Sequence, residues 1–66
     1  MNKPLFDEEI EKSGLRPGFI VDKLGISPQA YSKKRNGIVP FTLKEAKILR
    51  ELFNWSDSKV CKIFLD

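Results

Sequence analysis

Residues 17–36, which read PGFIVDKLGISPQAYSKKRN, decide the fold of this chain. The tripeptide Gly25-Ile26-Ser27 separates two short stretches that each carry helix start and stop signals. The first stretch begins at Pro17, a residue suited to the first helical position, and ends before Gly25. The second has Ser27 as its N-cap and is predicted to end at Gly37. Together they predict a helix-turn-helix arrangement, in which glycine supplies the positive φ of the turn and Ile26 fills the space between the helices.

Three further helical segments surround this motif, and no stretch shows the alternating β-branched pattern of a strand. One covers residues 5–13 and buries Phe6 and Ile10. Another opens with the capping box Thr42-Leu43-Lys44-Glu45, and the last is capped by Ser56. The apolar residues of these two helices recur at helical spacing: Leu43, Ala46, Leu49, Leu52 and Phe53 in one, Val60, Ile63 and Phe64 in the other. We therefore predict an all-α chain with five short helices in one domain, residues 1–66.

Three apolar residues outside these stripes are also expected in the core. In the loop after the second helix of the motif, residues 38–41, Ile38 and Phe41 are expected to pack against the core. Cys61 lies among apolar residues and is expected to be a small buried hydrophobe, because a lone cysteine without histidine lacks a base.

The composition excludes several classes of protein. A chain of 66 residues forms one small domain with a thin core. One cysteine and no histidine exclude a disulfide framework and a zinc site, so no metal and no cofactor are expected. An enzyme is not expected either, because the chain has no plausible nucleophile with a base and no phosphate-binding glycine loop. Short apolar runs predict no membrane span and no signal peptide, and hence a cytoplasmic protein.

The charged residues are unevenly distributed along the chain. Residues 1–30 carry four basic and five acidic side chains, whereas residues 31–66 carry eight basic and four acidic ones. A positive face beside a neutral remainder is typical of a nucleic-acid-binding protein. The alternative is a lysine-rich surface that is merely solvated, and the charge alone does not decide between them.

The helix that begins at Pro28 has two different sides. At about 100° per residue, Tyr31 and Arg35 share one side, while Gln29, Lys33 and Asn36 point the opposite way with Ser32 beside them. Glutamine can bond adenine with two hydrogen bonds, and lysine can donate to guanine. No acidic residue occurs between Asp22 and Glu45 to repel phosphates. The polar side therefore suits reading of a DNA groove.

Several segments of the chain resemble the Cro/C1-type (XRE-type) helix-turn-helix family of phage repressors and bacterial regulators. These are Gly14-Leu15, Leu24-Gly25-Ile26-Ser27 and the run from Tyr31 to Gly37, while Phe41-Thr42-Leu43 and Ile63-Phe64 are similar to small prophage Cro-like members. The resemblance covers about residues 5–64 and implies a lambda-repressor-like bundle with a helix-turn-helix at about residues 17–36. It also implies DNA-contacting residues: Gln29, Ser32 and Lys33 for bases, and Arg16, Ser27, Lys34, Asn36 and Lys44 for the backbone.

The function expected from these observations is transcription regulation by a phage- or prophage-type repressor that binds double-stranded operator DNA as a homodimer. A monomer this small buries too little surface on DNA to bind tightly. The dimer surface is expected around Trp55 and residues 60–65, with Trp55 itself as a core or hinge aromatic. The alternative is a phage switch modulator or antirepressor that binds a repressor protein, an interpretation favoured by the Pro17-Gly18-Phe19 helix entry and the modest net charge of +3.

Overall fold

Five helices make up the computed structural model, which describes residues 1–65. They are α1 (Lys3–Ser13), α2 (Pro17–Leu24), α3 (Pro28–Arg35), α4 (Leu43–Phe53) and α5 (Asp57–Phe64). No strand occurs in the described residues, so the all-α prediction is confirmed. None of these helices is long and apolar enough to cross a membrane.

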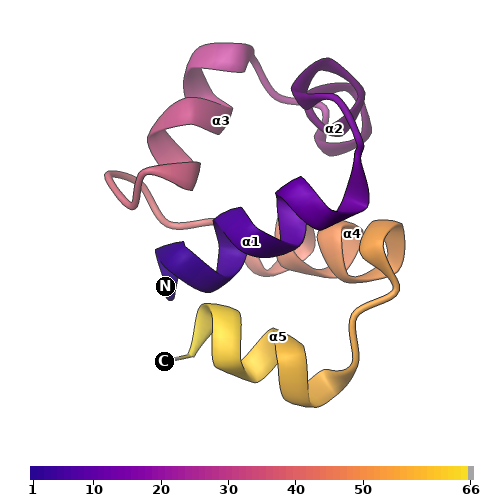
Figure 1. Cartoon of the computed structure of the whole chain (residues 1–66). Coiled ribbons are helices and arrows are strands. Elements are labelled where there is room, and N and C mark those ends of the chain that lie inside the picture. Colours follow the sequence, from indigo (N-terminus) through magenta and orange to yellow (C-terminus); the bar gives the residue numbers. More distant parts are fainter. Residues whose placement is uncertain (66) are drawn as a thin grey trace.

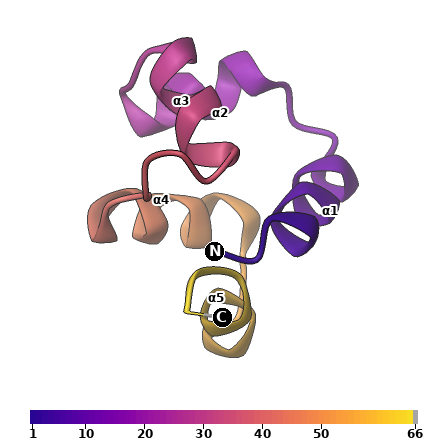
Figure 2. The same cartoon turned by 90° about the vertical axis from the view of Figure 1, so that its left-hand side faces the viewer.

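The helices are stacked in three levels. α1 and α4 form the middle level, with α2 and α3 on one side of it and α5 on the other (Figures 1 and 2). α2 packs against α3 and α4, and α1 packs against α3 and α5. α3 is therefore held at the outer edge of the fold, where one of its sides is free.

One fully buried side chain from each of α1, α2, α4 and α5 forms the centre of the core. These are Phe6, Ile20, Leu49 and Ile63. Around Phe6 gather the rings of Phe41, at a centroid distance of 5.3 Å, and Trp55, at 6.2 Å. Trp55 is buried in this cluster and the partly buried Phe41 packs against it, in agreement with the expected positions of both at the core.

The connection between α2 and α3 has the positive φ predicted at Gly25. Gly25 has a φ of 70°, in the left-handed region that glycine adopts without a Cβ clash. Its N–H donates to the carbonyl of Val21 at 2.9 Å and closes the last turn of α2. Ile26 then packs against the core from between the two helices. In Figure 1, α2 is seen almost end-on while α3 is seen from the side, so the two helices cross steeply.

Two helix boundaries differ from the prediction. α1 begins at Lys3 rather than Leu5, because the side chain of Asn2 accepts the N–H of Leu5 and Pro4 fits the first turn. α3 ends at Arg35 rather than at Gly37, and Asn36 is its C-cap.

Three residues expected inside lie at the surface. Ile38 is 72% exposed, because its N–H and that of Val39 bond to the carbonyl of Lys33 and turn the loop outward. Leu43 is 76% exposed, since the inward face of α4 is set by Glu45 and Leu49. Cys61 is exposed because it lies about 200° around α5 from the buried Ile63.

Candidate nucleic-acid interface

α3 is a short helix with strong local signals at both ends. The Ser27 side chain accepts the N–H of Ala30 at 3.1 Å, and Pro28 occupies the first position. At the other end the N–H of Asn36 bonds to the carbonyl of Ser32, and Gly37 takes a positive φ of 79°. Such a short helix is marginal on its own, so its orientation depends on what it packs against.

Tyr31 anchors the inner side of α3. Its side chain is 5% exposed, and its ring lies 6.5 Å from that of Phe41. Burial raises the pKa of the Tyr31 hydroxyl, in spite of the nearby Arg35 guanidinium. The ring therefore remains neutral at physiological pH and acts as an apolar anchor.

An ion pair joins α3 to α4. The Nζ of Lys34 lies 2.5 Å and 2.7 Å from the two carboxylate oxygens of Glu45, and the two side chains are only 13% and 9% exposed. The same carboxylate accepts the backbone N–H of Thr42 at 2.8 Å, which completes the predicted capping box. Burial favours the neutral acid, but the hydrogen bonds from Lys34 and Thr42 outweigh it, so the pKa of Glu45 is lowered.

This pairing changes the assignment of Lys34. The resemblance implied that Lys34 contacts DNA phosphate, but its ammonium is already held by Glu45 and is turned toward the body of the fold. A phosphate contact would require that ion pair to break. We therefore assign Lys34 to the attachment of α3 and leave it out of the candidate interface.

A second ion pair joins α3 to α1. The Nε of Arg35 donates to Asp7 at 2.9 Å, and the Nζ of Lys3 lies 2.5 Å from the other oxygen of the same carboxylate. Burial raises the pKa of Asp7, but the hydrogen bonds from Lys3 and Arg35 outweigh that effect and lower it. Two consecutive residues, Lys34 and Arg35, thus attach α3 to two different helices.

Acid is expected to weaken this attachment. The ordinary pKa values of the carboxyls of Glu45 and Asp7 are 4.5 and 3.8, and both pKa values are lower in the folded chain. Their stabilisation is therefore complete above the ordinary values and is lost as the pH falls through the lowered folded-state values. The urea midpoint should stay level above about pH 5 and fall progressively below it. Urea titrations from pH 7 to pH 2 measure this directly.

The control for this prediction is the double variant Asp7→Asn, Glu45→Gln. Its urea midpoint should be lower at neutral pH and fall less on acidification. Acid should still lower the urea midpoint of this variant in part, because a third carboxyl, that of Glu9, also has a lowered pKa. The cause is its hydrogen bond from Lys59. An acid sensitivity equal to that of the wild type would contradict the role given to Asp7 and Glu45.

The outer side of α3 carries the residues predicted to face DNA. Gln29, Ser32, Lys33 and Asn36 lie on it, and the Asn36 amide lies 3.4 Å from the Ser32 hydroxyl. They follow one another at helical spacing on the side opposite Tyr31. This face contains amide, hydroxyl and ammonium groups and no carboxylate.

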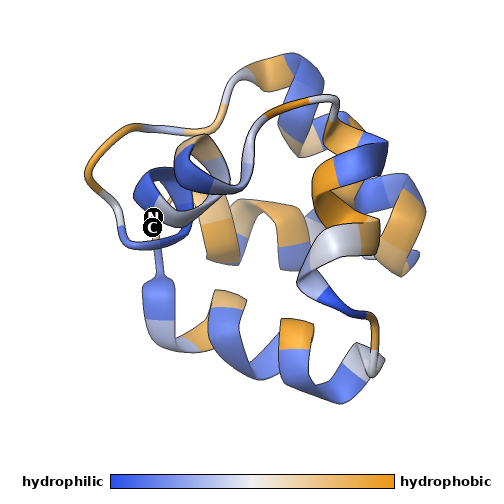
Figure 3. Ribbon diagram, turned by 90° about the horizontal axis from the view of Figure 1, so that it is seen from above, coloured by the Kyte–Doolittle hydropathy of each residue, from blue (hydrophilic) through white to orange (hydrophobic). Residues whose placement is uncertain are grey.

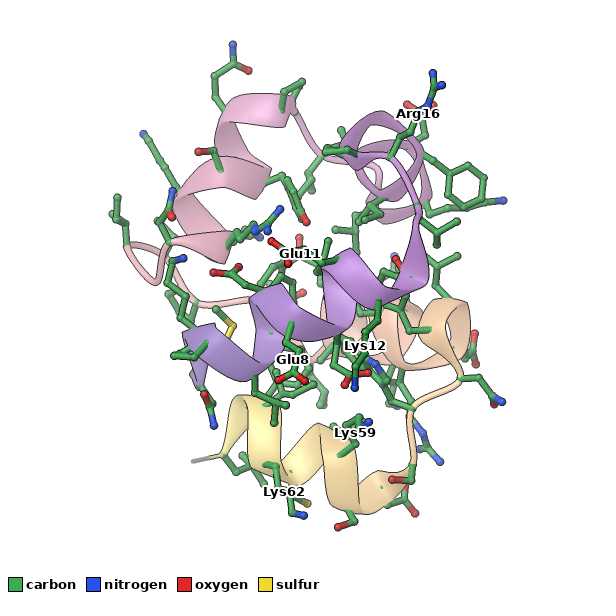
Figure 4. The ribbon with its side chains drawn as sticks, in the orientation of Figure 1. Glu8, Glu11, Lys12, Arg16, Lys59 and Lys62 are labelled. Atoms are coloured by element: carbon green, nitrogen blue, oxygen red, sulfur yellow. The ribbon has the colours of Figure 1, made fainter. Side chains whose placement is uncertain are left out.

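The remaining predicted contacts lie outside α3. Arg16 is the N-cap residue of α2, and Figure 4 shows its side chain pointing away from the body of the fold. Ser27 is exposed, and its hydroxyl retains an O–H to donate while its oxygen caps α3. Lys44 is exposed in the first turn of α4, one residue before the Glu45 that pairs with Lys34. The structure thus leaves these three side chains exposed.

The face formed by α1 and α5 is electrically mixed. Figure 4 shows Glu8, Glu11 and Lys12 on α1 facing the viewer, with Lys59 and Lys62 on α5 below. Lys12 lies 3.4 Å from Glu8, and Lys59 lies 3.1 Å from Glu9. Charges of both signs therefore offset one another on this face, whereas the outer side of α3 has only basic and neutral groups.

The described residues contain no group of three or more potential metal ligands, and Cys61 has no second thiol to pair with. Comparison with protein-family models, with curated protein sequences and with solved structures gives no significant match.

Proposed function

We propose that this chain is a sequence-specific, double-stranded DNA-binding regulator of transcription, of the Cro/C1 type that its motifs resemble. The observation that supports the proposal most strongly is the division of α3 into two sides. Tyr31, Lys34 and Arg35 attach the helix to the body of the fold. Gln29, Ser32 and Lys33 are left at the surface on a helix at the edge of the molecule.

The dimensions of α3 suit the major groove. An α-helix with its side chains is about 10–12 Å in diameter, and the major groove of B-DNA is about 12 Å wide. In that groove Gln29 would bond adenine, Lys33 would donate to guanine, and Ser32 could bond either base. Arg16, Ser27, Asn36 and Lys44 would contact phosphates, which fix the register of the protein but carry no sequence information directly. A homodimer would read two half-sites in this way.

The experiment that tests the proposal is binding to random duplex DNA over a series of salt concentrations. A protein that neutralises phosphates releases counterions, so its affinity should fall linearly with salt on logarithmic axes. The absence of binding at low salt would contradict the proposal and turn the search toward a protein partner.

The adjacent lysines of α3 provide a matched pair of variants. On random duplex DNA, where the bases do not match the protein, the free ammonium of Lys33 should neutralise a phosphate, so Lys33→Met should reduce the salt slope by about 1. Lys34→Met should leave the salt slope of the folded protein unchanged, because its ammonium is held by Glu45 in the body of the fold. Fluorescence anisotropy with a labelled duplex measures both slopes under identical conditions. An equal reduction in the two variants would contradict the assignment of Lys34.

A second candidate function is binding to a repressor protein. Phe19 on α2 is 44% exposed, and the Nζ of Lys23 lies 5.3 Å from the centre of its ring. Aromatic side chains are enriched at protein–protein interfaces. The DNA proposal is preferred because Phe19 stands alone on α2, whereas four polar side chains share the outer side of α3.

A further inference from the structure

The buried contact of α3 with the rest of the fold contains an unpaired polar group. α3 is hydrophilic along most of its length (Figure 3), and Tyr31 is the one buried residue among residues 28–35. Its ring packs near that of Phe41, but its hydroxyl oxygen is fully buried and has no hydrogen-bond partner among residues 1–65. The residue that anchors α3 through its ring therefore also carries a group that the fold does not satisfy.

Such a hydroxyl lowers the stability of the folded chain. It gives up its hydrogen bonds to water on folding, and no protein group replaces them. Phenylalanine would fill the same space without this loss. Buried polar groups without a partner are rare in folded proteins, and local violations of this kind are expected mainly at functional or strained sites. The hydroxyl of Tyr31 lies on the helix that carries the candidate interface.

The guanidinium of Arg35 is the donor placed to pair with this hydroxyl. Arg35 follows Tyr31 by about one turn on the same side of α3. Burial raises the pKa of the Tyr31 hydroxyl, and the positive charge of Arg35 opposes that effect, so the two groups lie close together. A guanidinium carries several N–H donors in a rigid planar fork. In the structure its Nε donates to Asp7 of α1 at 2.9 Å, and the Tyr31 hydroxyl is left outside hydrogen-bond geometry.

We propose that the contact between α1 and α3 has two arrangements, which differ in the partner of the Arg35 guanidinium. In the arrangement that the structure shows, Arg35 bonds Asp7 and the Tyr31 hydroxyl is unpaired. In the other, the guanidinium donates to the hydroxyl, and Asp7 keeps its bond from Lys3. The second arrangement gains a buried hydrogen bond and gives up an ion pair whose side chains are both 27% exposed. Because each of these interactions is worth little in net terms, the two arrangements are close in free energy.

The exchange alters the attachment of α3 to α1 and leaves its attachment to α4 in place. Lys34 stays paired with Glu45 in both arrangements, so α3 adjusts its position against α1 about this fixed point. A ligand that binds one arrangement better shifts the balance toward it. Adjustment of α3 to DNA half-sites of different shape is a step that rests on the proposed function, whereas the two arrangements do not.

Tyr31→Phe tests whether the hydroxyl is unpaired. The equilibrium constant for unfolding, measured by urea titration, should fall by at least about threefold, because the variant keeps the ring and removes the unsatisfied group. Tyr31→Leu is the matched control. It removes the hydroxyl together with the aromatic contact to Phe41, so it should raise the same constant by about tenfold.

NMR relaxation dispersion of the pure protein tests the second arrangement. Backbone amides of α3, and those of α1 around Asp7, should show exchange on the microsecond-to-millisecond timescale. Tyr31→Phe should abolish this exchange, because it offers the Arg35 guanidinium no second acceptor. Amides around the fully buried Leu49 of α4 are the internal control and should show no exchange in either protein.

Two results would overturn the inference. A Tyr31→Phe variant less stable than the wild type would show that the hydroxyl is hydrogen-bonded in the folded chain. Absence of exchange in α3 of the wild type, or equal exchange in Tyr31→Phe, would show that the contact has a single arrangement. Because no DNA is present, these results are separate from the proposed function. A protein with a single arrangement that still binds duplex DNA with a steep salt slope would refute this inference and leave the DNA proposal standing.

Discussion

Phe6→Ala is expected to lower the free energy of unfolding by about 3–5 kcal/mol. The Phe6 side chain is fully buried, and its ring meets Phe41, Trp55 and Phe64 at centroid distances of 5.3, 6.2 and 6.4 Å. Alanine would remove the contacts between α1 and these three rings and leave a cavity among them. A chain of 66 residues has a total stability of about 3–10 kcal/mol, so much of the variant should be unfolded at 25 °C.

Urea unfolding followed by tryptophan fluorescence measures this effect, since Trp55 is the single tryptophan and packs against Phe6. Phe19→Ala is the control, because it makes the same change at a side chain that is 44% exposed. Phe19→Ala should shift the free energy of unfolding by less than about 1 kcal/mol. Equal shifts in the two variants would contradict the placement of Phe6 at the centre of the core.

The sequence predicts helix starts well, because a cap acts over three or four residues. Ser27, Thr42 and Ser56 are each expected to cap a helix, and each side chain accepts a backbone N–H three residues on. The predicted start of α1 is two residues late, because the acidic run that suggested it lies inside the helix and the cap is Asn2. The positive φ at Gly25 also follows from local sterics and is predicted correctly.

Properties that depend on distant residues are predicted less well. The spacing of Leu43 and Leu49 indicates an apolar stripe, but the structure turns Leu43 outward and buries Glu45. The capping box predicts the bond between the Glu45 side chain and the start of its own helix. It does not predict the ion pair between Glu45 and Lys34, which lies eleven residues earlier. The same holds for Asp7, whose bond to Arg35 spans 28 residues.

In the candidate interface, too, local features are predicted well and contacts with distant residues are not. Helical spacing alone is enough to group Gln29, Ser32, Lys33 and Asn36 on the outer side of α3. Neither charge nor resemblance separates Lys34 from Lys33, because the difference lies in a carboxylate on another helix. The sequence feature that could suggest the ion pair between Lys34 and Glu45 is a capping-box glutamate in the helix that follows a lysine-rich helix.

The ion pair between Lys34 and Glu45 gives the second large expected effect. Glu45→Gln should lower the free energy of unfolding by about 3 kcal/mol, the lower end of the range for breaking a buried pair. The variant leaves the Lys34 ammonium without its counterion in a site where the two side chains are only 13% and 9% exposed. It also weakens the capping box that starts α4, where the Glu45 carboxylate accepts the N–H of Thr42.

Loss of this ion pair should destabilise α3 more than the rest of the fold. With Glu45 replaced by a neutral residue, Arg35 and Asp7 supply the remaining ion pair that holds the helix. Folded Glu45→Gln protein should therefore show faster amide exchange in α3 than in the part of α4 around the buried Leu49. A helix that is less firmly oriented should also bind duplex DNA more weakly, if the proposed function is right.

A double-mutant cycle separates the contribution of the ion pair to the free energy of unfolding from the other contributions of Glu45. Adding Lys34→Met to Glu45→Gln removes the unpaired charge, so the double variant should be more stable than Glu45→Gln alone. Glu51→Gln, an exposed glutamate on the same helix, is the matched control and should change the free energy of unfolding by less than about 0.5 kcal/mol. If Glu45→Gln were no more destabilising than Glu51→Gln, the attachment of α3 would have to rest on Tyr31 and Arg35 alone. In that case Lys34 would be free to contact phosphate after all, and Lys34→Met would reduce the salt slope of DNA binding as Lys33→Met does.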